Sequence, residues 1–220
     1  MRMESLLMTL AGFFRSGTSH RVRIALGLKG LSYAYQAICL PRGEHLSDAY
    51  LQLNPQGLVP VLQVEGKALS QSPAILEWLE ETFPDPPLLP AAADDRARVR
   101  AMAAMIGCDV HPINNLRVLN HLKSQFGANA EQLAAWARHW IGKGFDALET
   151  LLARDQGHCG FCFSERPTLA DCYLIPQVFS ARRFNLDLAP YPLICGIDEN
   201  CGTLSAFLRA RPSEQPDAVP

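Results

Sequence analysis

A proline-rich segment divides the chain into two halves of different character. Residues 83–95 read FPDPPLLPAAADD, and the prolines lack the backbone N–H that a continuing helix requires. Before this segment short strand patterns alternate with helix patterns, whereas every long pattern after it is helical. We therefore expect a semi-rigid linker between an α/β domain over residues 8–86 and an all-helical domain over residues 92–212.

The first half contains the elements of a small α/β domain. Strand patterns cover residues 8–14, 33–38, 59–64 and 67–70. One helix is expected from Ser19 to Lys29, and a second begins with Ser72 as N-cap and Pro73 at the first helical position. The order is β-α-β followed by β-β-α, and we interpret residues 1–7 as an N-terminal extension.

The second half consists of helical patterns. They cover residues 95–120, 131–153, 168–182 and 198–210. Thr168 and Asp171 predict a capping box, in which each side chain bonds a free backbone N–H at the start of a helix. The polar, proline-containing tail over residues 211–220 is expected to fray.

Composition excludes several classes of function. The 220 residues carry a formal charge of −2 and no long basic run, so nucleic acid is not an expected partner. The apolar N-terminal stretch is too short to span a bilayer and contains Glu4, so neither a membrane nor a signal peptide is expected. Seven cysteines without disulfide-framework spacing fit a reducing cytoplasm. The single pair Cys159 and Cys162 offers too few ligands for structural zinc, so no metal is expected.

The stretch FFRSGTSHRVRIAL, residues 13–26, places hydroxyl side chains where a strand gives way to a helix. Free N–H groups and the positive end of the helix dipole favour an anion at such a place. A thiolate is one such anion, and Ser16 can donate a hydrogen bond to it. The alternative is that Ser16, Thr18 and Ser19 act only as caps and turn formers.

Two further segments of the first half have features of a peptide-binding site. Pro60 lies just inside a predicted strand, which fits a cis Val59-Pro60 bond that presents the Val59 backbone to a ligand, or an ordinary edge strand. Gln71 and Ser72 precede a helix, where a carboxylate can accept from the Ser72 hydroxyl and N–H, or where Ser72 is simply a cap.

The helical half carries its own polar candidates. His111, Asn115 and Arg117 interrupt a helix otherwise rich in alanine, methionine and isoleucine, which indicates either a site wall or a solvated face. Arg182 and Arg183 lie near a helix end, where their charge also complements the dipole without any ligand.

Together these residues resemble the zeta class of the glutathione transferase superfamily, which includes maleylacetoacetate and maleylpyruvate isomerases. The resemblance covers almost the whole chain from Met8 and rests on RSGTSHRVRIALGLKG, LNPQGLVPVL, SQSPAILEWLEE, CDVHPINNLRVL and PTLADCYLIPQ. It implies the glutathione transferase fold, with a thioredoxin-like α/β N-terminal domain, an all-α C-terminal domain and a homodimer. The zeta class usually has Ser-Ser-Cys after the arginine, whereas this chain has Gly17 and Thr18 in place of the second serine and the cysteine.

The resemblance also implies a role for each candidate residue. Catalytic roles fall to Ser16, which faces the glutathione sulfur, with Arg15 and Thr18 beside it. Glutathione binding falls to His45, Val59, Pro60, Gln71, Ser72, His111 and Asn115. Binding of a small dicarboxylate substrate falls to Arg15, Arg117, Arg182 and Arg183.

The activity that the resemblance implies is glutathione-dependent cis-trans isomerisation of maleylpyruvate to fumarylpyruvate. A thiolate adds to the double bond of the cis-enedioate, the resulting single bond rotates, and elimination releases the trans product, so glutathione is regenerated as a cofactor. The Gly-Thr version of the motif favours maleylpyruvate over maleylacetoacetate. Alternatives are maleylacetoacetate isomerase, a general glutathione S-transferase, and a non-catalytic glutathione-binding protein.

Overall fold

A computed structural model of the chain describes residues 6–154 and 159–219, arranged in two compact units. One unit comprises Met1–Pro87 with Leu204–Pro220, and the other comprises Leu88–Thr203. The C-terminal residues that were expected in the helical domain therefore pack with the first unit. Of the extension expected over residues 1–7, residues 1–5 lie outside the described part of the chain.

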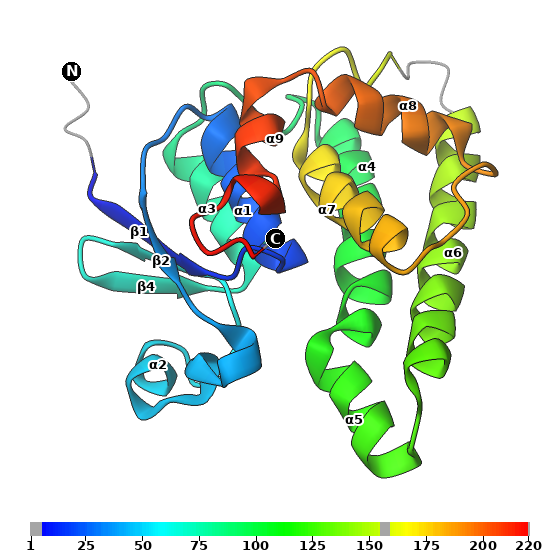
Figure 1. Cartoon of the computed structure of the whole chain (residues 1–220). Helices are drawn as coiled ribbons and strands as arrows, with labels where there is room; N and C mark the ends of the chain where they lie inside the picture. The colour runs from blue at the N-terminus through cyan, green and yellow to red at the C-terminus, as the bar shows by residue number, and fades with distance from the viewer. Residues whose placement is uncertain (1–5, 155–158, 220) are drawn as a thin grey trace. The chain divides into compact units, whose positions relative to one another are not determined.

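A four-stranded mixed sheet forms the centre of the first unit (Figure 1). The strands are β1 (Met8–Gly12), β2 (Ala34–Ala37), β3 (Val61–Val64) and β4 (Lys67–Ser70), in the order β2-β1-β3-β4. β2 is parallel to β1, whereas β3 is antiparallel to both β1 and β4. Leu10 and Leu62, which pair across β1 and β3, are completely buried because these two strands are central.

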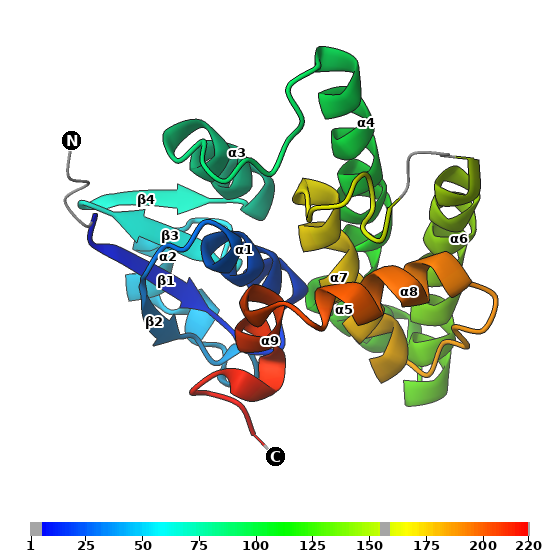
Figure 2. The ribbon, with the colours of Figure 1, turned by 90° about the horizontal axis from the view of Figure 1, so that it is seen from above.

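Helices cover both faces of this sheet. Figures 1 and 2 show α1 (Gly17–Leu28) and α3 (Ser72–Thr82) together on one face and the short α2 (Asp48–Leu53) on the other. Two 3₁₀ turns, Leu40–Arg42 and Glu44–Leu46, lead into α2. The β-α-β and β-β-α order is thus the one that the sequence predicted.

Two helix starts differ from the prediction. Helix α1 begins at Gly17, earlier than expected, because Ser16 is its N-cap and its Oγ accepts from the Ser19 N–H at 3.2 Å. Gln71 is the N-cap residue of α3, without a capping bond from its side chain, so Ser72 is the first helical residue. Ser72 is therefore not a cap, and its hydroxyl is left for another partner.

The C-terminal segment forms specific contacts within the first unit. Helix α9 (Ser205–Ala210) packs on α1 at Gly27, where an added Cβ would lie 3.2 Å from the Cα of Ala206. The turn Pro212–Glu214 follows, and the Gln215 side chain donates to the carbonyls of Arg209 and Arg211. The expectation of a frayed tail is wrong because these side-chain bonds fix the segment after α9.

The second unit is helical. Its helices are α4 (Ala93–Ala104), α5 (Leu116–Phe126), α6 (Ala130–Arg154), α7 (Leu169–Arg183) and α8 (Pro192–Cys201). The single helix expected over residues 95–120 is interrupted by a π-helical turn, Met105–Val110, and by a 3₁₀ turn that begins at Pro112. The helix expected over residues 198–210 is also wrong, because α8 and α9 are separate helices with Gly202 between them.

The start of α7 confirms the predicted capping box. Asp171 Oδ2 accepts from the Thr168 N–H at 2.7 Å and from its hydroxyl at 2.9 Å, and Oδ1 accepts from the Cys162 N–H. Burial raises the pKa of the Asp171 carboxyl, although these hydrogen bonds act in the opposite direction. Burial also raises the pKa of the Cys162 thiol, so Cys162 behaves as a core residue.

Some classes of site and segment are not found in the part of the chain that the structure describes. No cluster of histidine, cysteine and acidic side chains there has the arrangement of a metal site. Within the same residues, no helix combines the length and the apolar character needed to cross a membrane.

Candidate active site

A chain of hydrogen bonds joins the start of α1 to the residue before the cis-proline. Ser16 Oγ lies 2.9 Å from Thr18 Oγ1, and Thr18 Oγ1 donates to the Val59 carbonyl oxygen at 2.8 Å. Because a hydroxyl has one hydrogen, Thr18 accepts from Ser16 while it donates to Val59. The structure therefore brings together three of the predicted residues and fixes the direction of the bonds between them.

This direction separates the roles of the two hydroxyl groups. The Thr18 proton is committed to the Val59 carbonyl, so Thr18 anchors the start of α1 to the segment that leads through Pro60 into β3. Ser16 is half-buried, and rotation about its Cβ–Oγ bond can turn its proton from Thr18 to an anion at the N-terminus of α1. Ser16 is thus the hydroxyl donor available to a thiolate.

The Val59-Pro60 peptide bond is cis, as the position of Pro60 suggested. Val59 is 9% exposed, and no residue within 6–154 or 159–219 accepts a hydrogen bond from its N–H. An N–H without an acceptor in the protein can donate to a ligand. The Val59 N–H is therefore available to a peptide-like ligand, and its C=O, which accepts from Thr18, keeps a second lone pair.

Gln71 and Ser72 lie at the start of α3. Gln71 has a φ of 68°, in the left-handed region that costs a non-glycine residue about 1–3 kcal/mol, and strain of this kind is concentrated at ligand sites. Its side-chain amide donates to Gln56 Oε1 at 2.5 Å. Ser72 is buried at the first helical position, where its backbone N–H has no intrahelical acceptor.

Arg21 supports Ser72 from α1, a residue that the sequence interpretation missed. Arg21 is 2% exposed, and its Nη1 donates to Ser72 Oγ at 3.4 Å. Because Ser72 Oγ accepts from this guanidinium, the Ser72 hydroxyl hydrogen is left to bind a carboxylate. The sequence did contain a signal for Arg21. From Ser19 to Arg23, polar side chains lie on several sides of a helix that is buried within the first unit.

His45 lies in the turn before α2. It is half-buried, and its Nδ1 is buried without a hydrogen-bond partner among the described residues. Burial lowers the pKa of this imidazole, so His45 is neutral near pH 7. A neutral ring can either donate to or accept from a ligand.

Arg15 is the exposed cation nearest in sequence to Ser16. Its guanidinium lies 5.7 Å from the centroid of the Phe14 ring, and this cation–π contact favours side-chain positions near the ring. An exposed guanidinium with this restraint can bind a carboxylate in bidentate fashion.

In the second unit, the predicted polar residues occupy the irregular turn between α4 and α5. His111 ends the π-helical turn, and Asn115 caps α5 by accepting from the Arg117 N–H at 3.2 Å. Arg117 is exposed in the first turn of α5, where a cation is unfavourable to the helix dipole. The position of Arg117 therefore does not stabilise α5 through the helix dipole.

Arg182 and Arg183 end α7 and differ in their partners. Arg182 Nη2 pairs with Asp198 Oδ2 at 2.6 Å, which neutralises its charge within the second unit. The Arg183 guanidinium lies 4.4 Å from the centroid of the Phe184 ring. Both guanidinium groups are exposed at the end of α7, so each can reach an anionic ligand.

Models of the N-terminal and C-terminal domains of glutathione S-transferase match residues 15–82 and 128–210. The chain belongs to the glutathione S-transferase family. These matches confirm the predicted fold class, with an α/β N-terminal part and a helical C-terminal part. The interval over residues 83–127 contains the linker, α4 and α5.

Individual glutathione S-transferases resemble this chain over nearly their whole length. A maleylpyruvate isomerase of Ralstonia sp is 58% identical and a maleylacetoacetate isomerase of Pseudomonas aeruginosa is 49% identical; each alignment covers 96% of this chain and at least 98% of the relative. A solved holo maleyl pyruvate isomerase of the zeta class has a TM-score of 0.95 at 58% identity, covering 96% of this chain and 100% of that one. The resemblance to the zeta class is confirmed.

A second solved structure shows what a more distant member binds. The maleylacetoacetate isomerase of Anaeromyxobacter dehalogenans, solved with dicarboxyethyl glutathione and citrate in its active site, has a TM-score of 0.87 at 43% identity. It covers 98% of this chain and 99% of its own.

Proposed function

We propose that this glutathione S-transferase catalyses the glutathione-dependent cis-trans isomerisation of maleylpyruvate to fumarylpyruvate. The observation that carries the proposal is the Ser16 hydroxyl at the N-terminus of α1, held beside the cis-proline through Thr18 and Val59. The substrate class is supported by the Ralstonia maleylpyruvate isomerase, which is 58% identical over its full length.

The residues of the first unit fit glutathione. The Val59 N–H has no acceptor among the described residues and matches the backbone of a bound peptide, and the N-terminus of α3 with the Ser72 hydroxyl matches a carboxylate. Gln71, before α3, and His45, in the turn before α2, add polar groups in the same unit. When bound, glutathione supplies a thiolate that adds reversibly to the substrate double bond. The single bond that results can rotate before the thiolate is eliminated.

The protein's task is to keep the thiol ionised and to balance the negative charge of the substrate. Ser16 donates its hydroxyl hydrogen to the thiolate, and the free N–H groups of α1 add a favourable field. Guanidinium groups bind the two substrate carboxylates and the developing oxyanion. We assign this to Arg15 and Arg117 and to one of the adjacent residues Arg182 and Arg183, as predicted from the sequence.

A second candidate function is the same chemistry on maleylacetoacetate. The Pseudomonas aeruginosa maleylacetoacetate isomerase is 49% identical, and both substrates are cis-enedioates conjugated to a carbonyl. The Ser16 site serves either substrate, so specificity depends on the helical unit. The expected homodimer and the cytoplasmic location remain predictions.

An isomerisation assay tests the proposed function. The purified chain is mixed with maleylpyruvate, with and without glutathione, and formation of fumarylpyruvate is followed. We expect turnover that requires glutathione and leaves its concentration unchanged. Turnover that ignores glutathione contradicts the proposal, consumption of glutathione into a product indicates a general transferase, and a much faster reaction with maleylacetoacetate favours the second candidate.

Substitution of the paired arginines tests the assignment at the end of α7. Of Arg182→Ala and Arg183→Ala, the variant that removes a substrate ligand is expected to raise the KM for maleylpyruvate by about tenfold, because a charged hydrogen bond contributes about 1.5–3 kcal/mol. The other variant is expected to keep a KM near that of the unmodified chain, since loss of an exposed ion pair such as Arg182–Asp198 has little effect. Steady-state kinetics at saturating glutathione measure both, and an unchanged KM in both variants would contradict a substrate role for either arginine.

A further inference from the structure

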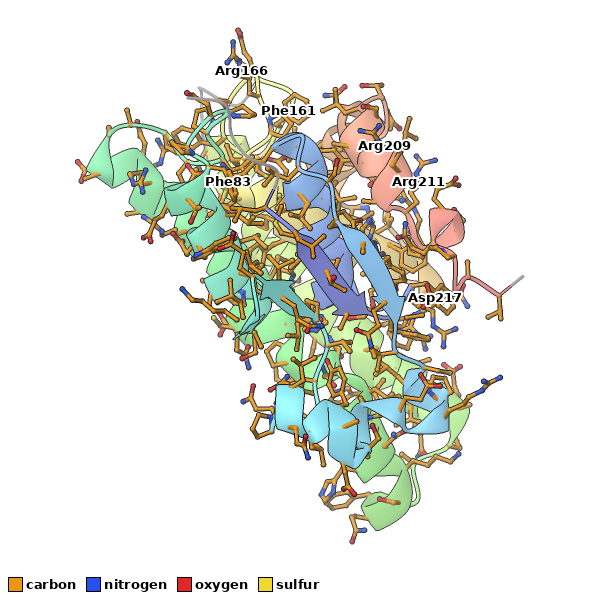
Figure 3. The ribbon with its side chains drawn as sticks, turned by 90° about the vertical axis from the view of Figure 1, so that its left-hand side faces the viewer. Phe83, Phe161, Arg166, Arg209, Arg211 and Asp217 are labelled. Carbon is orange, nitrogen blue, oxygen red and sulfur yellow. The ribbon has the colours of Figure 1, made fainter. Side chains whose placement is uncertain are left out.

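The C-terminal segment holds the backbone that leads into the proposed catalytic residues. Asp217, labelled in Figure 3, lies on the segment after α9. Its Oδ2 accepts from the Phe14 N–H at 3.0 Å and from the Tyr35 hydroxyl on β2 at 3.3 Å. Phe14 is followed directly by Arg15 and Ser16, so a residue more than two hundred positions away restrains the peptide that precedes them.

Arg23 holds the next peptide group, between Phe14 and Arg15. Its Nη2 donates to the Phe14 carbonyl at 2.8 Å, and its Nε donates to the Ala210 carbonyl at the end of α9 at 3.0 Å. Burial lowers the pKa of Arg23, which is 1% exposed, while the nearby Asp217 carboxylate favours its charged form. Both polar groups of Phe14 are thus bonded to charged side chains, one of them from the C-terminal segment.

Apolar packing links the segment to the site as well. Ala218 packs against a buried cluster that includes Phe13, Phe14 and Val59. Val59 supplies the carbonyl that Thr18 binds, so the segment packs on the same cluster that contains the end of the Ser16–Thr18–Val59 chain. An ordinary surface tail has no such arrangement of contacts.

We propose that Asp217 is a positioning residue for Ser16 and Arg15, acting through the Phe14 peptide. The inference rests on the proposed function, in which Ser16 donates to the glutathione thiolate. Asp217 holds the peptide group between Phe13 and Phe14 and Arg23 holds the one between Phe14 and Arg15, so the path of the chain into Ser16 depends on both side chains. Small displacements of catalytic groups cost large factors in rate.

The test compares three variants within the same segment. Asp217→Ala removes the acceptor of the Phe14 N–H, and Asp217→Asn keeps an oxygen acceptor but removes the charge. Glu214→Ala is the matched control, because Glu214 is an exposed acid whose only described side-chain partner is Ser213, so the net charge changes equally. For each we measure kcat/KM, the pKa of bound glutathione from thiolate absorbance, hydrogen exchange of the amides over residues 13–16, and Tm.

For Asp217→Ala we expect a loss of about tenfold in kcat/KM and a rise of about one unit in the pKa of the bound thiol. Amide exchange over residues 13–16 is expected to be at least several-fold faster, since the Phe14 N–H loses its acceptor. Asp217→Asn is expected to fall between this variant and the unmodified chain. Glu214→Ala is expected to match the unmodified chain in all four measurements.

A lower Tm for Asp217→Ala with unchanged thiol pKa and kcat/KM would overturn the inference, because the segment would then be only structural. If Asp217→Ala does not fold, Asp217→Asn decides: a thiol pKa and an exchange rate equal to those of the unmodified chain overturn the inference. The exchange measurement needs no glutathione. An unmodified chain that fails to bind glutathione therefore contradicts the proposed function alone. Unchanged amide exchange over residues 13–16 in Asp217→Ala contradicts the positioning role of Asp217.

Discussion

Ser16→Ala is expected to lower kcat/KM for isomerisation by about a hundredfold, the effect of removing one preorganised donor to a developing or bound anion. The pH at which activity appears is expected to rise. A free thiol has a pKa near ~8.5, and a reduction of ~2 units, about 2.7 kcal/mol, makes the thiolate predominant at neutral pH. Without the Ser16 donor the thiol pKa moves back up, so activity appears only at higher pH. The pH profile of kcat/KM measures both effects.

Ser47→Ala is the matched control for this variant. Ser47 Oγ accepts from the Tyr50 N–H at 3.3 Å and caps α2, as Ser16 caps α1, but it takes no part in the Ser16–Thr18–Val59 chain. Loss of either cap costs about 1 kcal/mol of stability. We expect Ser47→Ala to lose stability and keep its pH profile. If Ser16→Ala also kept its pH profile, Ser16 would be a cap and the thiolate donor would lie elsewhere.

Glu80→Ala is expected to reduce the free energy of unfolding by about 3–5 kcal/mol, because it leaves a buried ammonium group without its carboxylate. Lys29 Nζ pairs with Glu80 Oε2 at 2.8 Å, and the two side chains are 0% and 6% exposed. The same ammonium donates to the carbonyls of Phe83 and Pro86, where α3 ends and the linker begins. Urea unfolding followed by circular dichroism measures the change.

Two variants show whether burial causes this loss. Glu131→Ala breaks the exposed ion pair with Arg138 and is expected to cost less than 1 kcal/mol. The double variant Lys29→Met with Glu80→Leu removes both charges and is expected to recover most of the stability that Glu80→Ala loses. Equal losses for Glu80→Ala and Glu131→Ala would show that the Lys29 site is effectively solvated.

The predicted element order and fold class agree with the structure because local patterns encode them. Short apolar runs specify β1 and β3, and the Thr168–Asp171 box specifies the start of α7 through bonds within one helical turn. The prediction failed over residues 95–120 and 198–210. There, a π-helical turn and a break at Gly202 interrupt otherwise continuous helical patterns.

Several residues that the sequence predicted for the site lie at the starts of helices, because short motifs encode helix starts. Ser16, Ser72 and Asn115 each lie within one residue of a helix start. The sequence interpretation missed Arg21, Arg23 and Asp217. Arg21 contacts Ser72, Arg23 contacts Phe14 and Ala210, and Asp217 contacts Phe14. No local pattern in the sequence reveals partners that lie in other segments of the chain.

By itself, the sequence determined two domains, the hydroxyl-rich start of α1, the proline that takes the cis bond and the residue classes suited to glutathione. These features depend on local backbone preferences and on side-chain chemistry. Only the tertiary structure decided that Thr18 binds the Val59 carbonyl, that Arg182 is paired with Asp198, and that the C-terminal segment returns to hold Phe14. A hydrogen bond between distant residues is fixed by packing of the whole unit, which brings its donor and acceptor together.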